Sequence, residues 1–184
     1  MKRSIFGSRG ASQKILCRRD RLDYGLLYRH PNLTVYGYTV TSRRNKKYNC
    51  VAFAAGDCNW WWEPDDEPGY FWPKSVPKDY AIENYIKVFE LQGYSICSDN
   101  SLEKGFEKVA VYEDQNGGFA HVCRQIETGE WISKLGRCED ISHSSLQALA
   151  DQVYGFPAHY LRRRITLWIR IQKRLRSFLC QSEI

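Results

Sequence analysis

Three short apolar segments near the middle of the chain, joined by tight turns, constrain the fold more than any other feature of the sequence. Residues 108–114 (KVAVYED) and 119–126 (FAHVCRQI) flank a turn that contains Asn-Gly-Gly, and residues 130–135 (EWISKL) follow a second turn, ETGE. Each segment has the length and the β-branched and aromatic residues of a strand. Turns this short join antiparallel neighbours. The sequence therefore predicts an antiparallel meander.

Two helices are expected before the meander. Residues 80–94 carry apolar side chains at helical spacing, and Gly93 provides a stop. A shorter helix is expected to begin at Cys50, with Asn49 as its cap. Residues 56–79 lie between the two helices and contain four prolines and many aromatic residues, which indicates a long functional loop. Helices segregated from a meander are typical of the α+β class.

The segments before and after these elements give the predicted division of the chain into three parts. Residues 31–40 are expected to form a strand and residues 142–155 a helix. From Pro157 onward the pattern predicts a long basic amphipathic helix. We therefore divide the chain into a basic N-terminal arm (1–33), an α+β domain (34–156) and a C-terminal basic amphipathic helix (157–184).

Composition and charge limit the compartment and the partners. At 184 residues the chain is long enough to bury a core without disulfides. Its net charge of +6 is concentrated at both ends, which is compatible with an anionic partner such as nucleic acid or a membrane surface, and equally with basic termini that are simply solvated. No stretch reaches the ~18 apolar residues of a membrane span, and no secretory signal is evident, so we expect a cytoplasmic protein. The seven cysteines include no CxxC pair, so we expect reduced thiols and neither metal nor cofactor.

Cys50 and His121 are the residues from which we expect chemistry. A thiol attacks as the thiolate, and its pKa of ~8.5 falls at the positive end of a helix or beside an imidazole. Cys50 lies where a helix should begin, and His121 lies on the middle strand of the sheet that this helix would cover. We therefore expect them to meet as nucleophile and base. The side chain of Asn49 could donate a hydrogen bond to the oxyanion, together with the backbone N–H of Cys50.

A third group would hold the imidazole, and the register of the hairpin decides which residue does so. If the turn is a two-residue Thr-Gly loop, Lys134 lies on the same face as His121. If Gly129 forms a one-residue bulge, Ser133 lies there instead. Asp140, just beyond the hairpin, is the nearest carboxylate that could reach back to the ring.

The order of a cysteine at a helix start, a histidine on a strand and a polar residue on the next strand resembles the papain-like fold of NlpC/P60 and CHAP-type thiol hydrolases. More specifically, the chain is similar to the uncharacterised bacterial DUF7689 family in the segments YNCVAFAAGDCNWWWEP, YFWP, LQGYSICSDNSLEKGFEKVAVYED, HVCRQIETGEWISKLG and EDISH. The similarity extends from Tyr36 to Arg163, and WISKLG and DISH are its most specific motifs. It implies a papain-like α+β fold in which the cysteine-bearing helix packs on the antiparallel sheet. The NlpC/P60-like spacing favours position 133 for the third catalytic residue, where this chain has a serine.

The function expected from these residues is a cysteine-dependent hydrolase, namely a peptidase, amidase or deamidase that acts by acyl transfer. Cys50 and His121 would be assisted by Asp140 or Ser133, and the substrate would be a peptide or protein. The expected substrate-binding residues lie in the aromatic loop and the hairpin: Trp60, Trp61, Trp62, Tyr70, Trp72 and Lys134. Three consecutive tryptophans cannot all face inward, so at least one of them is expected to be partly exposed.

A binding module without catalysis is the alternative. The tryptophan-rich loop and the basic, tyrosine-containing termini would then engage a protein or nucleic-acid partner. The C-terminal helix carries an apolar stripe opposite its arginines. We expect this helix to dock on the body or to join a second copy as a homo-oligomer, in preference to lying on an anionic membrane.

Overall fold

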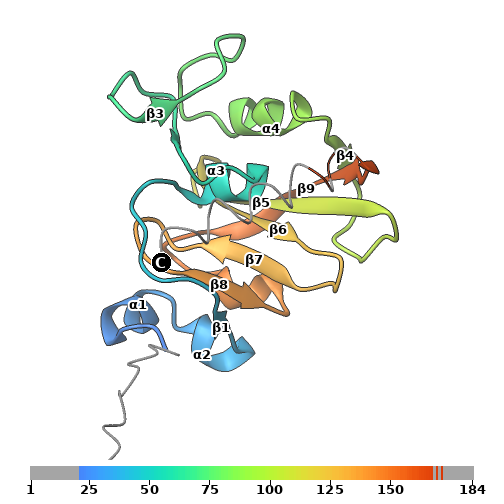
Figure 1. Ribbon diagram of the computed structural model, residues 1–184. Coiled ribbons are helices and arrows are strands. Elements are labelled where there is room, and N and C mark those ends of the chain that lie inside the picture. The colour runs from blue at the N-terminus through green and yellow to red at the C-terminus, as the bar shows by residue number, and fades with distance from the viewer. Residues whose placement is uncertain (1–20, 168, 170, 172–184) are drawn as a thin grey trace, which may run out of the picture.

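A seven-stranded antiparallel sheet forms the centre of the protein (Figure 1). The computed structural model describes residues 21–167, 169 and 171. The strand order across the sheet is β1-β8-β7-β6-β5-β9-β4. The strands are β1 (Thr39–Val40), β4 (Ser95–Cys97), β5 (Phe106–Glu113), β6 (Phe119–Gln125), β7 (Trp131–Lys134), β8 (Asp140–His143) and β9 (Phe156–Arg164). The helices are α1 (Tyr24–Arg29), α2 (Asn32–Tyr36), α3 (Cys50–Ala55), α4 (Ile82–Glu90) and the short 3-10 helix η1 (Leu146–Leu149).

The predicted meander is confirmed, because β5, β6 and β7 are consecutive antiparallel neighbours. The turn between β6 and β7 is closed by the N–H of Gly129, which donates to the carbonyl of Ile126 at 2.9 Å. Gly129 has φ 91°, a left-handed conformation that favours glycine. The turn is therefore longer than a two-residue loop, and Arg124 pairs with Ile132 across the hairpin.

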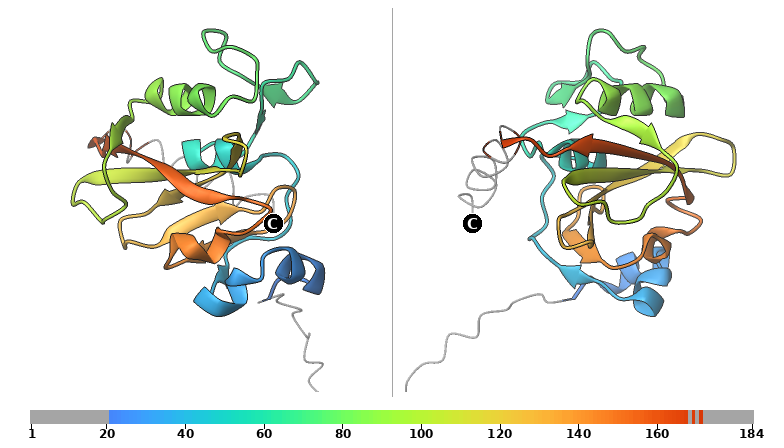
Figure 2. Two further views of the ribbon diagram at one scale, coloured as in Figure 1. Left: turned by 180° about the vertical axis from the view of Figure 1, so that it is seen from behind. Right: turned by 90° about the vertical axis from the view of Figure 1, so that its right-hand side faces the viewer.

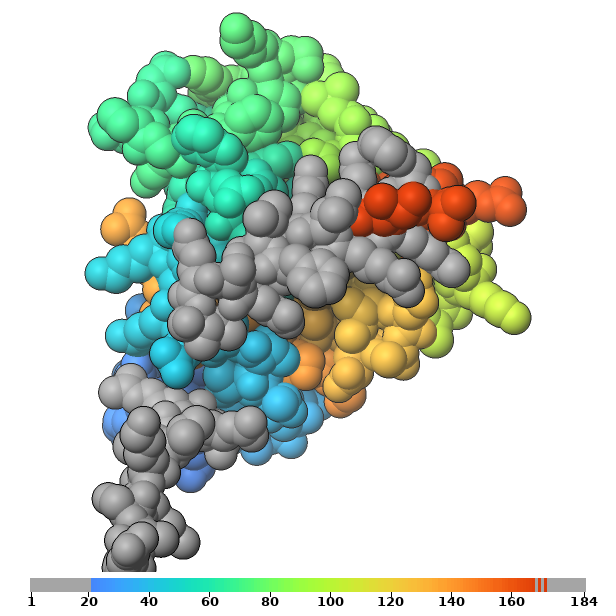
Figure 3. Space-filling view, viewed as in Figure 1, coloured from blue at the N-terminus to red at the C-terminus, as the bar shows by residue number. Residues whose placement is uncertain are grey.

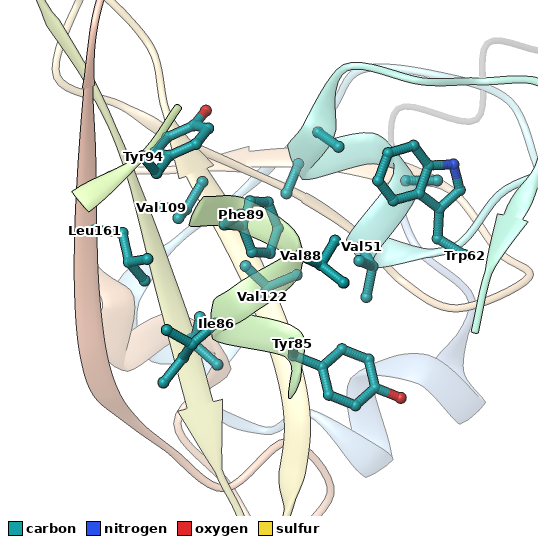
Figure 4. Packing of buried hydrophobic residues seen from close by; sticks show 14 of the residues in the cluster. Val51, Trp62, Tyr85, Ile86, Val88, Phe89, Tyr94, Val109, Val122 and Leu161 are labelled. Atoms are coloured by element: carbon teal, nitrogen blue, oxygen red, sulfur yellow. The ribbon is translucent and has the colours of Figure 1, made fainter. Parts of the chain in front are cut away.

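Helices cover both faces of the sheet, and the alternation of side chains along the central strands separates the two faces. Val109, Val111 and Val122 point toward α3 and α4 and join the cluster drawn in Figure 4, which we call the α3/α4 face. Tyr112 and Cys123 point the other way, into a second cluster with residues of α1, α2 and η1, which we call the α1/α2 face. Figure 2 shows α4 and the pair α1 and α2 on opposite sides of the sheet. The α+β class is therefore confirmed.

Two of the predicted elements are wrong near the ends of the domain. Residues 31–40 were expected to be a strand, but half of this segment forms α2, which buries Leu33 and is followed by Gly37 with φ 80°. The strand prediction holds at the end of the segment, where β1 lies. Residues 142–155 were expected to be a helix, but β8 and η1 occupy the first part. The helix cannot continue there because Asp151 caps a turn by accepting the backbone N–H groups of Val153 and Tyr154 at 2.8 and 2.9 Å.

The predicted C-terminal helix is wrong at its start, because residues 156–164 form β9. This strand lies between β5 and β4 and pairs with both. Two of its three arginines form ion pairs: Arg162 binds Glu103 at 2.7 Å, and Arg163 binds the buried Glu107 at 2.7 Å. Residues 168, 170 and 172–184 lie outside the described part, so the remainder of the predicted helix is not tested by the structure.

The folded body also begins earlier than expected. Leu22, Leu26 and Leu33 are buried on the α1/α2 face, although all three belong to the segment that we assigned to the N-terminal arm. The residues from 21 to 33 are thus part of the domain, and residues 1–20 lie outside the described part.

Two further findings concern the helices and the cysteines. None of the helices in the described part of the chain is both long and apolar enough to cross a membrane. Cys50, Cys97, Cys123 and Cys138 have free thiols. Cys58 is disulfide-bonded, so the expectation of reduced thiols does not hold for this residue.

Candidate functional site

Asn49 caps α3 as the sequence predicts. Its side-chain oxygen accepts the backbone N–H of Ala52 at 3.1 Å, and Gly56 ends the helix in a left-handed conformation. The helix has six residues, which form CVAFAA and bury their small side chains against the sheet. Cys50 therefore lies in the first turn of α3, where we expected it.

The thiol of Cys50 is held neutral rather than activated. It packs at the edge of the α3/α4 cluster and hydrogen-bonds to the backbone of Val122. Burial raises the pKa of Cys50 to about 11, and the backbone contacts with Val122 and Val51 offset this only in part. At neutral pH the side chain is accordingly a thiol and not a thiolate.

His121 points away from α3. Its ring is fully buried, stacks on Tyr154 with a centroid distance of 4.1 Å, and meets the ring of Tyr112 edge-on at 5.5 Å. Neither ring nitrogen has a hydrogen-bond partner. Burial lowers the pKa of His121 well below its ordinary value.

Cys50 and His121 therefore do not form a hydrogen-bonded pair. The reason lies in the alternation along β6: Val122 points to the α3/α4 face, so its neighbour His121 points to the other side of the strand. The Cys50 thiol contacts the backbone of Val122, which follows His121 in the chain, but it forms no hydrogen bond with the His121 ring.

The two candidates for the third catalytic residue, Ser133 and Asp140, lie in different surroundings. The pairing of Arg124 with Ile132 puts Ser133 on the same face as His121, which is the register of the bulged turn. The hydroxyl of Ser133, however, bonds to Nε2 of His143 at 2.9 Å. Ser133 therefore positions a different imidazole from the one that we expected.

Asp140 and Lys134 lie together on the α3/α4 face. Tyr48 donates its hydroxyl to Asp140 at 2.7 Å, and the Lys134 ammonium lies 3.5 Å from the other oxygen of this carboxylate. The ammonium also lies 4.8 Å from the centroid of the Tyr48 ring. Burial lowers the pKa of Lys134 and raises the pKa of Asp140. The carboxylate thus belongs to a buried ion pair beneath α3 and does not orient His121.

A stack of three rings on the α1/α2 face, formed by the buried His30 and His121 with the half-buried Tyr154 between them, was not found by sequence reasoning. His30 bonds to Asp151 at 2.8 Å and stacks on Tyr154 at 4.4 Å, and the opposite partner of Tyr154 in the stack is His121. No sequence signal predicts this arrangement, because its members are far apart along the chain. Within residues 21–167 no cluster of His, Cys, Asp and Glu has the geometry of a metal site.

Most of the expected substrate-binding residues lie in residues 57–80, a segment that we call the flap. Asn49, besides capping α3, binds both backbone groups of Trp62: its amide donates to the carbonyl at 2.7 Å, and its oxygen accepts the N–H at 3.2 Å. Trp62 and Trp72 are buried, and Trp72 meets Tyr85 of α4 edge-on at 5.1 Å. The flap is thereby attached to both helices of the α3/α4 face.

Other aromatic side chains of the flap face solvent. Trp60 is 49% exposed, Phe71 40% and Tyr80 56%, so the expectation that one of the consecutive tryptophans is partly exposed is confirmed. Trp61 and Tyr70 are half-buried and pair across β2 (Trp61–Trp62) and β3 (Tyr70–Phe71), two short parallel strands. Figure 3 shows the flap at the upper end of the molecule, far from the blue α1. Exposed large aromatic residues gathered on one segment are typical of a binding surface.

The flap is acidic although the whole chain is basic. It has two lysines, Lys74 and Lys78, against six carboxylates: Asp57, Glu63, Asp65, Asp66, Glu67 and Asp79. Lys78 is paired with Asp66. A cationic partner therefore complements the charge of this surface.

Comparison with known proteins identifies a family but no activity. Neither the curated proteins nor the solved structures contain a match to this chain. The resemblance to NlpC/P60 and CHAP-type hydrolases is thus not supported, whereas the similarity to DUF7689 is. The model of the family described as "Domain of unknown function (DUF7689)" matches residues 39–162, which include α3, the flap and the sheet from β1 to most of β9. Because this match covers more than half of the chain, the protein belongs to the DUF7689 family.

Proposed function

We propose that this protein is a binding module that holds a positively charged segment of a partner protein on its flap. The observation that carries the proposal is the exposure of Trp60, Phe71 and Tyr80 on an acidic segment that is fastened to the core. Aromatic side chains supply most of the binding energy in protein interfaces, and opposite charge around them selects the partner.

The attachment of the flap supports this function. Trp62 and Trp72 are buried. The side chain of Asn49 forms two hydrogen bonds with the backbone of Trp62 in β2, and a third with the backbone of Ala52, which caps α3. A surface that is ordered before binding loses less conformational entropy when the partner arrives. The exposed rings of Trp60, Phe71 and Tyr80 therefore lie on a segment that is already fastened to the core before the partner binds.

The charge of the flap favours a protein partner over nucleic acid at this surface. Phosphates would be repelled by the carboxylates of Asp65, Asp66 and Glu67, all of which lie on exposed residues. The hydrolase is not our proposal, because the Cys50 thiol is neutral and the His121 ring is not hydrogen-bonded to it.

Fluorescence anisotropy on the full chain tests the proposal, with a labelled peptide of alternating arginine and glycine as the probe. The peptide should bind, and the double variant Trp60→Ala/Phe71→Ala should lower its affinity by about tenfold or more, as expected for aromatic anchors. The matched control is Tyr24→Ala/Tyr28→Ala, which removes two rings on α1 that are 83% and 77% exposed. This control should leave the affinity within about twofold.

Two results would overturn the proposal. One is the absence of binding by the wild-type chain at low salt, where attraction between opposite charges is strongest. The other is an equal loss of affinity in the flap variant and in the α1 variant, which would show that the flap has no special role. A peptide of alternating glutamate and glycine should not bind.

A further inference from the structure

Trp61 already holds a cation in the free protein. The central carbon of the Arg137 guanidinium lies 5.2 Å from the centroid of the Trp61 ring, which is within the ~6 Å range of cation–π attraction. Arg137 is an exposed residue in the turn between β7 and β8. It forms no ion pair within the described residues, so Trp61 is its principal partner there.

The groups around Trp61 suit a flat cation. The ring of Tyr70 lies nearly parallel to it, at a centroid distance of 6.2 Å and an angle of 24°. The indole N–H of Trp61 donates to Glu63, and the hydroxyl of Tyr80 also bonds to this carboxylate. These bonds fix the orientation of the indole and place a negative charge at its edge.

We propose that the flap recognises an arginine side chain of its partner, and that Arg137 is an internal competitor that occupies this position over Trp61 in the absence of the partner. This inference rests on the proposed function and specifies the partner side chain that the flap binds, an arginine. A guanidinium fits better than an ammonium because it is planar, stacks on aromatic rings and is more weakly hydrated. A carboxylate beside the ring adds the geometry that guanidinium groups bind best.

The inference predicts opposite effects for the two members of the contact. Arg137→Gln should raise the affinity for the arginine–glycine peptide about two- to fivefold, because it removes the competing cation. Trp61→Leu keeps apolar volume but removes the aromatic face, and it should lower the affinity about tenfold. A peptide of alternating lysine and glycine should bind the wild-type chain at least about threefold more weakly than the arginine peptide.

A charge-matched control separates competition from net charge. Arg29→Gln removes one positive charge from the exposed end of α1, far from the flap. It should change the affinity for the arginine peptide by less than about 1.5-fold at physiological salt, where distant charges are screened. All three variants are measured on the full chain by anisotropy.

The outcomes distinguish this inference from the proposed function. If Arg137→Gln and Arg29→Gln raise the affinity equally, or if Arg137→Gln has no effect, Arg137 does not compete and the inference is overturned while the flap remains a binding surface. Equal binding of the lysine and arginine peptides also overturns it. If neither peptide binds the wild-type chain, the proposed function fails together with it. The comparison of Arg137→Gln with the wild type tests whether Arg137 competes with the peptide, even if the Trp61→Leu variant folds poorly.

Discussion

Acidification should weaken the fold through His143, and the size of the effect follows from the surroundings of its ring. His143 is buried, and its Nδ1 lies 2.8 Å from the carbonyl of Ser145. Because a carbonyl can only accept, Nδ1 carries the hydrogen, and Nε2 is left to accept the hydroxyl of Ser133 at 2.9 Å. A second proton would add a buried charge and would force the Ser133 hydroxyl to accept a hydrogen bond from Nε2 in place of donating one. Burial therefore lowers the pKa of His143 to about 4, from an ordinary value of 6.5.

The sign of the effect follows from the direction of the shift. The unfolded chain binds the proton more tightly, so the stability that depends on the neutral ring is present above pH 6.5 and is lost as the pH falls toward 4. Between about pH 7 and about pH 5 this single group should lower the free energy of unfolding by about 2 kcal/mol. Burial also lowers the pKa of His121, so that ring acts in the same direction.

Denaturant unfolding followed by tryptophan fluorescence measures the effect when wild type and His143→Asn are compared at about pH 7 and about pH 5. The variant should be less stable at the higher pH because it loses the bonds to Ser133 and Ser145. Its free energy of unfolding should, however, fall by about 2 kcal/mol less than that of the wild type between the two pH values. Carboxylates contribute equally to both proteins and cancel in this comparison. The same pH dependence in both proteins would refute a neutral, buried ring at position 143.

Two more predictions concern the residues from which chemistry was expected. His121→Phe should raise the free energy of unfolding by about 1–2 kcal/mol in a thermal melt, because both ring nitrogens are buried without partners and phenylalanine keeps the stacking on Tyr154; a clear drop in melting temperature would contradict this. Cys50 should react with iodoacetamide at neutral pH no faster than Cys97 or Cys138, because burial raises its pKa. Peptide mapping by mass spectrometry gives the relative rates, and preferential labelling of Cys50 would restore the case for a nucleophile.

The parts of the fold that sequence reasoning predicted are those in which local signals agree. The meander combines strand-length segments with short turns, and Asn49 precedes a run of small helix formers, so pattern and turn chemistry point to the same elements. The strand β9 shows the opposite case. Its three arginines and apolar residues fit a helix by spacing. The partners that favour a strand, namely the neighbouring β5 and β4 and the carboxylates of Glu103 and Glu107, are all distant in the sequence.

The candidate site was harder to predict because it depends on which side of a strand each residue faces. The order of Cys50 and His121 along the chain is compatible with contact, but the orientation of Val122 toward α3 turns His121 to the opposite side. Hairpin register was similarly open, and the bulge at Gly129 decided it. The partial exposure of one of the three consecutive tryptophans could be predicted from the sequence. That it is Trp60, and that the surface around it is acidic, became evident only in the structure.

The position of β9 has a consequence for synthesis on the ribosome. Among the strands that the structure describes, β4 pairs with β9 alone, so it lacks this partner until the chain has emerged as far as Arg164. Until then Glu107 also lacks the guanidinium of Arg163, which lies 2.7 Å from its carboxylate. Nascent chains truncated before Phe156 should thus be unable to close the sheet, and assembly of this domain has to wait for its last strand.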